Sequence, residues 1–390
     1  MSKHMNVAEF FAGIGLMRLG LEKAGWRVDF ANDIAADKEE MYRGHFGDSD
    51  GHFCLGDIHN LTANHVPTVS LATASFPCND LSLAGGRAGL AGKHSSAVWG
   101  FTHLIKAMKN RRPPMVLIEN VPGFLSSNGG RDFEEVLLSL NDLGYAVDTF
   151  FLNAASFVPQ SRQRLFILGI KSKTSEPELL EDGFFEDSVR SPALSDFIFT
   201  HPDIQWHLRS LPDPPKRRSC LDDFIEDVPS NSSLWWNKER SSYLLSQMSP
   251  RHKKIADKMI AEKKKSFGTV FRRVRNGKSM AELRTDGVAG CLRTPRGGSG
   301  RQILFEASNG SYRVRLLSPR ECACLMGADD FKLNVPLNQA LFGFGDAVCV
   351  PVIEWIANNY LNPVWEERFK PMPARKTKTK PTRYTKVARA

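Results

Sequence analysis

The stretch "NVAEFFAGIGLMRLGLEKAGWRVDFAND", residues 6–33, decides the fold. Its two short apolar runs, 6–11 and 27–32, are typical of β-strands. Between them the turn "FFAGIG" at 10–15 leads into a helix expected to begin near Leu16, and Gly13 and Gly15 would let the backbone approach a ligand closely. This order of elements predicts an α/β domain built on a largely parallel sheet.

The same alternation continues to about residue 170. Further strands are predicted at 68–75, 114–120, 146–152 and 164–170, and the short loop before the last one favours an antiparallel pair at the sheet edge. Helical spacing recurs in two apolar stripes: Val98, Phe101, Leu104, Ile105 and Met108, then Phe133, Val136, Leu137, Leu140 and Leu143. The glycine turn lacks the third glycine of GxGxxG, because Arg18 stands in its place, and this counts against a nicotinamide enzyme.

Composition and charge limit the class of protein. The chain has 390 residues, and its 52 Lys and Arg against 43 Asp and Glu give a net charge of +9, which is compatible with nucleic-acid binding without proving it. The seven cysteines form no CxxC pair, so neither a disulfide framework nor a zinc site is indicated, and we expect no metal. With no signal-like leader and no apolar run near the roughly 20 residues of a membrane span, we expect a cytoplasmic protein with no membrane partner.

Carboxylates follow two of the predicted strands. Asp33 ends the second strand, 20 residues after Gly13, where a carboxylate can accept from the hydroxyls of a ribose. Asp57, in "LGDIHNL", ends a plausible third strand and could accept from an adenine amino group. Each alone reads as a solvated loop residue. Together with the glycine turn they outline a site for a nucleoside-containing cofactor at the carboxyl edge of the sheet.

Three further motifs fall on the same edge. Cys78, in "ASFPCNDLSLAG" at 74–85, follows the fourth strand, and a cysteine in such a loop is more often structural than catalytic. Glu119, in "ENV", can hydrogen-bond the edge of a base and exchange a proton with it. In "QSRQR" at 160–164, alternation along a strand directs Arg162 and Arg164 to one side, although paired arginines commonly belong to a solvated face.

The ordered series "FAGIG", "PCN", "ENV", "QSRQR", "RLLSPRECACLMG" and "GDAV" resembles the conserved blocks of the DNA (cytosine-5) methyltransferase family, in the family's order and spacing. Any one block could arise by chance, whereas six in sequence are specific. The resemblance implies a Rossmann-like α/β sheet that binds S-adenosylmethionine, with a second, smaller target-recognition domain. It implies the modification enzyme of a restriction-modification system, which acts on double-stranded DNA as a monomer and pairs with a restriction endonuclease.

The resemblance also implies residue roles. Cytosine carbon 5 is a poor nucleophile, so a thiolate must first add to carbon 6, and Cys78 matches the family's nucleophile. Glu119 matches the residue that contacts the cytosine N3 and amino group, and Arg164 the arginine near O2, while Arg162 belongs to the same motif and could act on the base or the sheet. The implied cofactor-binding residues are Phe11, Gly13, Ile14, Gly15, Asp33, Asp57, Ile58, Asp346, Ala347 and Val348.

The family pattern divides the chain into four parts. These are a catalytic domain at 1–180, a target-recognition domain at 181–339, a segment at 340–362 that returns to the catalytic domain, and a basic tail at 363–390 expected to be disordered. Ser82 resembles a phosphate-contacting serine. Arg293 and Arg296, in "CLRTPRGGSGRQ", are candidates for guanine contacts, although most arginines in such domains only hold phosphates. The target base must leave the duplex stack, as it does for methyltransferases in general.

Three positions depart from the family pattern. Asn79 stands where glutamine is usual, Asp346 where asparagine is usual, and Leu16 where a small residue is common. Asp346 therefore adds a charge near the expected methionine end of the cofactor. Alternatives are a tRNA cytosine-5 methyltransferase, which shares the catalytic blocks, and a catalytically silent nucleic-acid-binding protein, against which the retained Cys78 and Glu119 argue.

Overall fold

The computed structural model describes residues 4–47, 51–77, 97–172, 188–275, 277–294 and 300–369. Its larger sheet has seven strands in the order β3-β2-β1-β4-β5-β7-β6. The strands are β1 Asn6–Phe10, β2 Arg27–Asp33, β3 Phe53–Leu55, β4 Leu71–Ala74, β5 Met115–Asn120, β6 Tyr145–Asn153 and β7 Gln163–Lys171. The first five pair in parallel, and β7 lies antiparallel between β5 and β6. The predicted parallel sheet with an antiparallel pair at one edge is confirmed.

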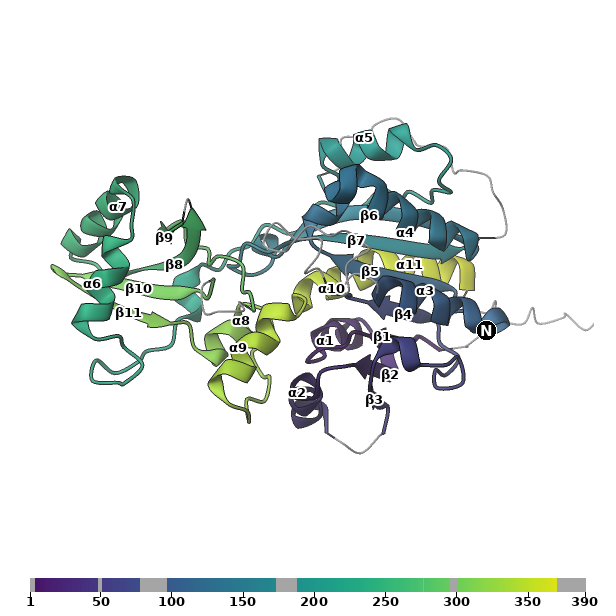
Figure 1. Cartoon of the computed structure of the whole chain (residues 1–390), viewed down its shortest axis with the longest axis horizontal. Coiled ribbons are helices and arrows are strands. Elements are labelled where there is room, and N and C mark those ends of the chain that lie inside the picture. The colour runs from purple at the N-terminus through teal and green to yellow at the C-terminus, as the bar shows by residue number, and fades with distance from the viewer. Residues whose placement is uncertain are drawn as a thin grey trace, which may run out of the picture.

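Helices cover both faces of this sheet (Figure 1). The core on one face includes residues of α1 Leu16–Lys23, α2 Ala36–Phe46 and α10 Val350–Ile356. The core on the other face includes residues of α3 Ala97–Ala107, α4 Arg131–Asp142 and α5 Pro192–Thr200. Side chains of β1 alternate between the two, because Val7 joins the first core and Ala8 the second. The result is a three-layer arrangement, in agreement with the α/β fold expected from the sequence.

A smaller antiparallel sheet lies at the other end of the molecule (Figure 1). Its order is β11-β10-β8-β9, and a core of its own joins it to two helices. The elements are α6 Lys238–Ser246, α7 Pro250–Ala261, β8 Ser266–Arg275, β9 Lys278–Arg284, β10 Ile303–Ser308 and β11 Ser311–Leu316. Residues of 188–206 and 317–331, which the sequence-based division places at 181–339, have side chains in the cores of the large sheet.

The C-terminal elements connect the two sheets. They are α8 Pro319–Cys324, α9 Leu337–Asp346, α10 and α11 Asn362–Val364. The helical run Leu337–Phe369 is long and apolar enough to cross a membrane by length and composition alone, with a mean hydropathy of 1.6 in its most apolar window. Because 61% of that window is buried inside the protein, the run is accounted for as core packing.

The topology places the site. β1, β2, β3, β4 and β5 run parallel, so their carboxyl ends meet at one edge of the sheet. The chain order reverses between β1 and β4, which are neighbours in the sheet. In open α/β sheets ligands bind outside the carboxyl ends of the strands at such a switch point.

Candidate active site

The glycine turn follows β1 and has an unusual backbone. Phe11, Gly13 and Gly15 have φ values of 55°, 56° and 83°, in the left-handed region that favours glycine. Among the described residues, no atom would lie within 4 Å of a Cβ built on Gly13, so this part of the structure leaves open space beside the turn. Gly15 differs, since a Cβ there would lie 2.4 Å from the Phe46 ring. Gly15 is thus required by packing, and Gly13 leaves room for a ligand.

Asp33 is fixed beside this turn. Its Oδ2 accepts from the Gly13 N–H at 2.8 Å and its Oδ1 from the Ala35 N–H at 2.9 Å. Burial raises the pKa of Asp33, while the two N–H groups and the charge of Lys38 oppose that rise. The carboxylate is therefore locked in one orientation at the end of β2, next to the open space at Gly13.

Two apolar side chains flank Asp33, and the sequence reasoning did not single them out. Ile34 is 66% exposed and Leu55, which pairs with Asp33 across β2 and β3, is 44% exposed. Large apolar side chains at this exposure suit the flat face of a base. The signal available in the sequence was an isoleucine placed directly after a strand-ending carboxylate.

Asp57 and Ile58 lie at the end of β3. Asp57 Oδ1 accepts from the His59 N–H at 2.9 Å and so caps the short turn Ile58–Asn60. The Ile58 side chain is buried against α3, where a Cβ on Gly100 would come within 2.8 Å of it. Any contact of Ile58 with a ligand must therefore come from its backbone.

Glu119 and Arg164 meet at the ends of β5 and β7. Arg164 Nε lies 2.8 Å from Glu119 Oε1, and both side chains are largely shielded, at 17% and 8% exposure. The antiparallel pairing of the two strands produces this contact, because Asn120 faces Leu165 across the ladder. A carboxyl group held by a guanidinium is thereby presented at the same edge as Asp33.

Arg162 forms hydrogen bonds with backbone carbonyls of other segments of the chain. It is 3% exposed, and its guanidinium donates to the backbone carbonyls of Leu292 at 2.9 Å, Gly345 at 3.2 Å and Ala347. Gln160 acts similarly, donating to the Leu325 carbonyl at 2.7 Å and accepting from the Leu292 N–H at 3.1 Å. In this structure Gln160 and Arg162 of the motif hold backbone segments together.

The last predicted cofactor residues surround the end of α9. Asp346 is exposed, Val348 is 5% exposed and lies in the core, and Ala347 is half-buried. Ile14 of the glycine turn is buried beside α9, because a Cβ on Gly343 would lie 3.0 Å from it. The structure thus brings the glycine turn, Asp33 and the 346–348 segment to one edge.

Three predicted residues, Cys78, Ser82 and Arg296, lie outside the described residues. The described segment 51–77 ends at Pro77, three residues beyond β4 and on the same edge. Asn120 anchors this end, since its Nδ2 donates to the Phe76 carbonyl at 3.3 Å. The strand that leads to Cys78 therefore points toward the edge that carries Glu119 and Arg164.

Glu9 is a buried carboxyl group that the sequence reasoning missed. It lies in β1, is 1% exposed, and neither carboxyl oxygen has a hydrogen-bond partner within the part of the chain that the structure describes. Burial raises the pKa of Glu9 to about 8, although the charge of Arg18 opposes the rise. The signal in the sequence was an acidic residue inside an apolar strand.

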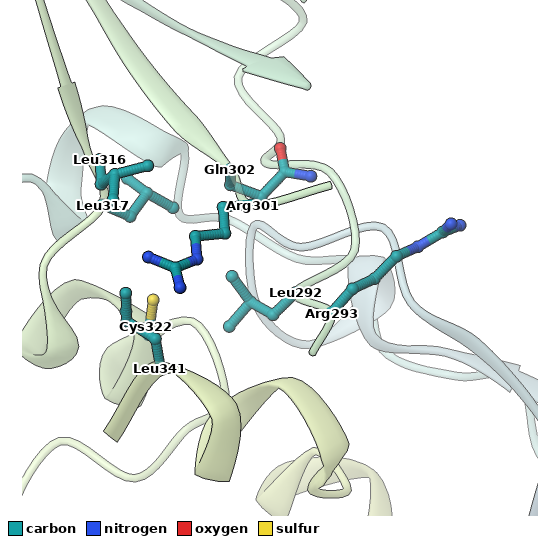
Figure 2. A pocket seen from close by; sticks show the side chains of 8 residues that line it. All are labelled: Leu292, Arg293, Arg301, Gln302, Leu316, Leu317, Cys322 and Leu341. Carbon is teal, nitrogen blue, oxygen red and sulfur yellow. The ribbon is translucent and has the colours of Figure 1, made fainter. Parts of the chain in front are cut away.

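A pocket lies away from this edge, where the small sheet meets α8 and α9 (Figure 2). Figure 2 shows the Arg301 guanidinium directed into the pocket beside Cys322, whereas Arg293 extends away from it. Arg293 is exposed. Within the described ranges, no group of His, Cys, Asp and Glu is arranged to hold a metal ion.

The fold and this edge define an S-adenosylmethionine-dependent methyltransferase. The open glycine turn and the fixed Asp33 carboxylate fit a cofactor with an amino-acid part and a ribose. More narrowly, the chain belongs to the C-5 cytosine-specific DNA methylase family, whose model matches residues 5–362. It is a DNA cytosine-5 methyltransferase, and S-adenosylmethionine is its methyl donor.

Curated relatives and solved structures agree with this assignment. The chain is 28% identical to the type II methyltransferase M.DsaV of Dactylococcopsis salina, over 92% of this chain and 87% of the relative. It is 25% identical to M.HhaI of Haemophilus parahaemolyticus, over 90% and 92%. The S. pombe Dnmt2 methyltransferase structure has a TM-score of 0.59 at 19% identity, covering 93% of this chain and 99% of that one. The Entamoeba histolytica methyltransferase EhMeth also has a TM-score of 0.59, at 16% identity, covering 94% and 99%. At these sequence identities, the similarity to the solved structures is evidence for the fold alone.

Proposed function

We propose that the protein methylates carbon 5 of one cytosine within a specific duplex DNA sequence, as the modification enzyme of a type II restriction-modification system. The observation that carries the chemistry is the Glu119–Arg164 pair at 2.8 Å, at the edge of the sheet where β4, the strand that precedes Cys78 in the sequence, also ends. The restriction-modification context is supported by relatives that are named type II methyltransferases.

The proposed reaction begins at the flipped-out base. The Cys78 thiolate adds to carbon 6 and forms an S–C6 bond, and the displaced electron pair makes carbon 5 nucleophilic. Glu119, held by Arg164, donates a proton to N3 as the adduct forms and takes it back as the adduct breaks down. S-adenosylmethionine would supply the methyl group that bonds to carbon 5, and the S–CH3 bond that breaks would leave S-adenosylhomocysteine. A base or water then removes the carbon 5 proton, the S–C6 bond breaks, and 5-methylcytosine and the free thiolate result.

The cofactor is proposed to lie along the edge described above. Phe11, Gly13, Ile14 and Gly15 would surround its amino-acid part, together with the backbone at 346–348. Asp33 would accept from the ribose hydroxyls, because its carboxylate is already oriented by two N–H groups. Asp57 and the Ile58 backbone would reach the adenine, with Ile34 against its face.

DNA is proposed to lie between this edge and the small sheet. Ser82 would contact a phosphate, and Arg293 and Arg296 are the proposed guanine contacts. We further propose that the enzyme acts as a monomer in the bacterial cytoplasm and protects the DNA from a partner endonuclease.

Transfer of label tests this proposal. The protein is incubated with tritiated S-adenosylmethionine and either duplex DNA or tRNA, and 5-methylcytosine is then located. Label in one cytosine of a short DNA sequence is the expected result. Label in tRNA alone would contradict the DNA substrate, and no label in any nucleic acid would favour a silent binding protein.

Covalent trapping tests the nucleophile separately. Duplex DNA with 5-fluorocytosine at the target position should give a stable protein–DNA adduct, because fluorine cannot leave as a proton does. Cys78→Ser should form no adduct and transfer no methyl group. Adduct formation by the Cys78→Ser variant would exclude Cys78 as the attacking residue.

A further inference from the structure

The C-terminal end of α9 is held by two cations and one hydroxyl group from three other parts of the chain. Lys38 Nζ donates to the Phe342 carbonyl at 3.2 Å, and Thr294 Oγ1 donates to the same carbonyl at 2.9 Å. Arg162 donates to the carbonyls of Gly345 and Ala347. The C-terminal end of a helix carries partial negative charge, so two buried cations are well placed there.

Lys38 makes one further contact, and it is an ion pair. Its Nζ lies 2.7 Å from Asp346 Oδ2, with side-chain exposures of 11% for Lys38 and 54% for Asp346. A carboxylate at the C-terminal end of a helix is unfavourable by itself, because it adds to the negative end of the helix dipole. Lys38 removes that penalty, since one ammonium group neutralises both the carboxylate and a helix-end carbonyl.

The charge of the Lys38 ammonium group also affects the Asp33 carboxylate. Lys38 lies in the first turn of α2, five residues after Asp33, and its charge favours the ionised form of that carboxylate against burial. α9 in turn packs against the glycine turn, because Gly343 leaves room for Ile14 and Met41. The charge of Lys38 thus acts both on Asp33, which is proposed to bind the ribose, and on Asp346, in the segment proposed to lie beside the amino-acid part of the cofactor.

From these contacts we infer that Lys38 is a positioning residue for the S-adenosylmethionine site, which uses the Lys38–Asp346 ion pair to hold the end of α9 against α2. The pair accounts for the charge at Asp346, where the family pattern has a neutral asparagine. This inference rests on the proposed placement of the cofactor.

The test is a double-mutant cycle with cofactor affinity as its readout. The affinity for S-adenosylhomocysteine is measured by calorimetry for the wild type, Lys38→Met, Asp346→Asn and the double variant. We expect Lys38→Met to weaken binding by about fivefold or more, and the double variant to bind no more weakly than Lys38→Met alone, because the two residues act through one contact. The KM for S-adenosylmethionine should rise while kcat at saturation stays within about threefold.

A matched control is the ion pair between Arg209 and Glu367. Two guanidinium nitrogens of Arg209 lie 2.7 and 2.9 Å from the two carboxylate oxygens of Glu367, and the side chains are 24% and 49% exposed. Arg209→Met and Glu367→Gln should leave the affinity unchanged, whatever they do to the melting temperature. Unchanged affinity in Lys38→Met, or effects of the two single variants that simply add, would overturn the inference. Wild-type protein that binds S-adenosylhomocysteine but methylates no DNA would contradict the proposed function alone and leave this cycle informative.

Discussion

At the scale of single residues, the proposed site contains polar groups whose orientation is fixed by neighbours close in the sheet. Asp33 is held by two backbone N–H groups, and Glu119 by the guanidinium of Arg164. Such fixed geometry is what catalysis by positioned groups requires, because little reorganisation is left to the reaction step. Substitutions that keep the shape and remove one charge or proton therefore test function with little effect on folding.

Glu119→Gln is the sharpest of these substitutions. The amide keeps the volume and can still accept from Arg164, but it cannot exchange a proton with the cytosine N3. We expect the single-turnover rate of methyl transfer to fall by roughly 10²–10⁴-fold, the range typical of a lost general acid–base. The melting temperature serves as the folding control. A rate within a few fold of wild type in a folded variant would exclude the proton-transfer role.

Glu9 gives a prediction about pH and stability. Its pKa in the folded state is raised from 4.5 to about 8, so the folded protein keeps a proton that the unfolded chain releases. The contribution of Glu9 to the free energy of unfolding is therefore fully present below pH 4.5 and is lost as pH rises to about 8. Glu9→Gln, which is neutral throughout, should become progressively more stable than wild type between pH 5 and 8, by on the order of a few kcal/mol at the upper end.

Melting temperatures of the Glu9→Gln variant and the wild type across this pH range measure the effect. The difference between the two should level off above pH 8, where both states of the wild type are ionised. A difference that is constant from pH 5 to pH 9 would show that Glu9 does not keep its proton in the folded protein.

At the scale of elements, strand ends were predictable and the contacts between distant elements were not. Asp33, Asp57 and Glu119 each end an apolar run, so period and position in the sequence placed them on one edge. Lys38 and Asp346 are 308 residues apart, and Arg162 and Gly345 are 183 apart. Nothing local in the sequence pairs such residues, because their contact depends on how α9 returns to the large sheet. Arg162 is an example. Its motif predicted a role toward the base or the sheet, whereas in the structure its side chain hydrogen-bonds to the backbone carbonyls of distant segments.

A buried ion pair joins the small sheet to α8, and a substitution that breaks it measures how much this connection stabilises the fold. Arg315 of β11 binds Glu321 of α8 through two contacts at 2.7 and 2.5 Å, with exposures of 1% and 0%. Glu321 also accepts from the Ser318 N–H in a capping box. Glu321→Gln leaves a buried guanidinium without its anion, so we expect the free energy of unfolding to fall by about 3–5 kcal/mol.

Urea denaturation of Glu321→Gln measures this loss, and Glu282→Gln is the control. Glu282 pairs with Arg273 at 2.8 Å and with Arg275 at 3.3 Å, and the three side chains are 21%, 41% and 61% exposed. Ion pairs this accessible to solvent contribute about 1 kcal/mol or less. Equal decreases in the free energy of unfolding of the two variants would mean that the buried Arg315–Glu321 pair stabilises the protein no more than the pair at Glu282.

At the scale of the whole molecule, the net charge is unevenly distributed along the chain. The segment 374–390 carries seven Lys and Arg residues and no Asp or Glu, so it holds seven of the nine net positive charges. The remaining residues, which include both sheets, are close to neutral overall. Sequence-independent attraction to DNA phosphates depends on cationic charge, whereas recognition depends on particular groups near the base. The two contributions should therefore be separable by truncation.

A chain that ends at Pro373 tests this separation. We expect its affinity for non-specific duplex DNA at low salt to fall, and the slope of log affinity against log salt to become shallower, by about 0.9 for each phosphate contact that the segment supplies. The methylated sequence should not change, because the proposed catalytic and recognition residues all precede residue 300. Binding measured from about 50 to 200 mM salt supplies the slope, and sequencing of methylated DNA supplies the specificity. An unchanged slope would place the phosphate contacts on the two sheets and their loops, and the net charge of those parts would then say little about where DNA binds.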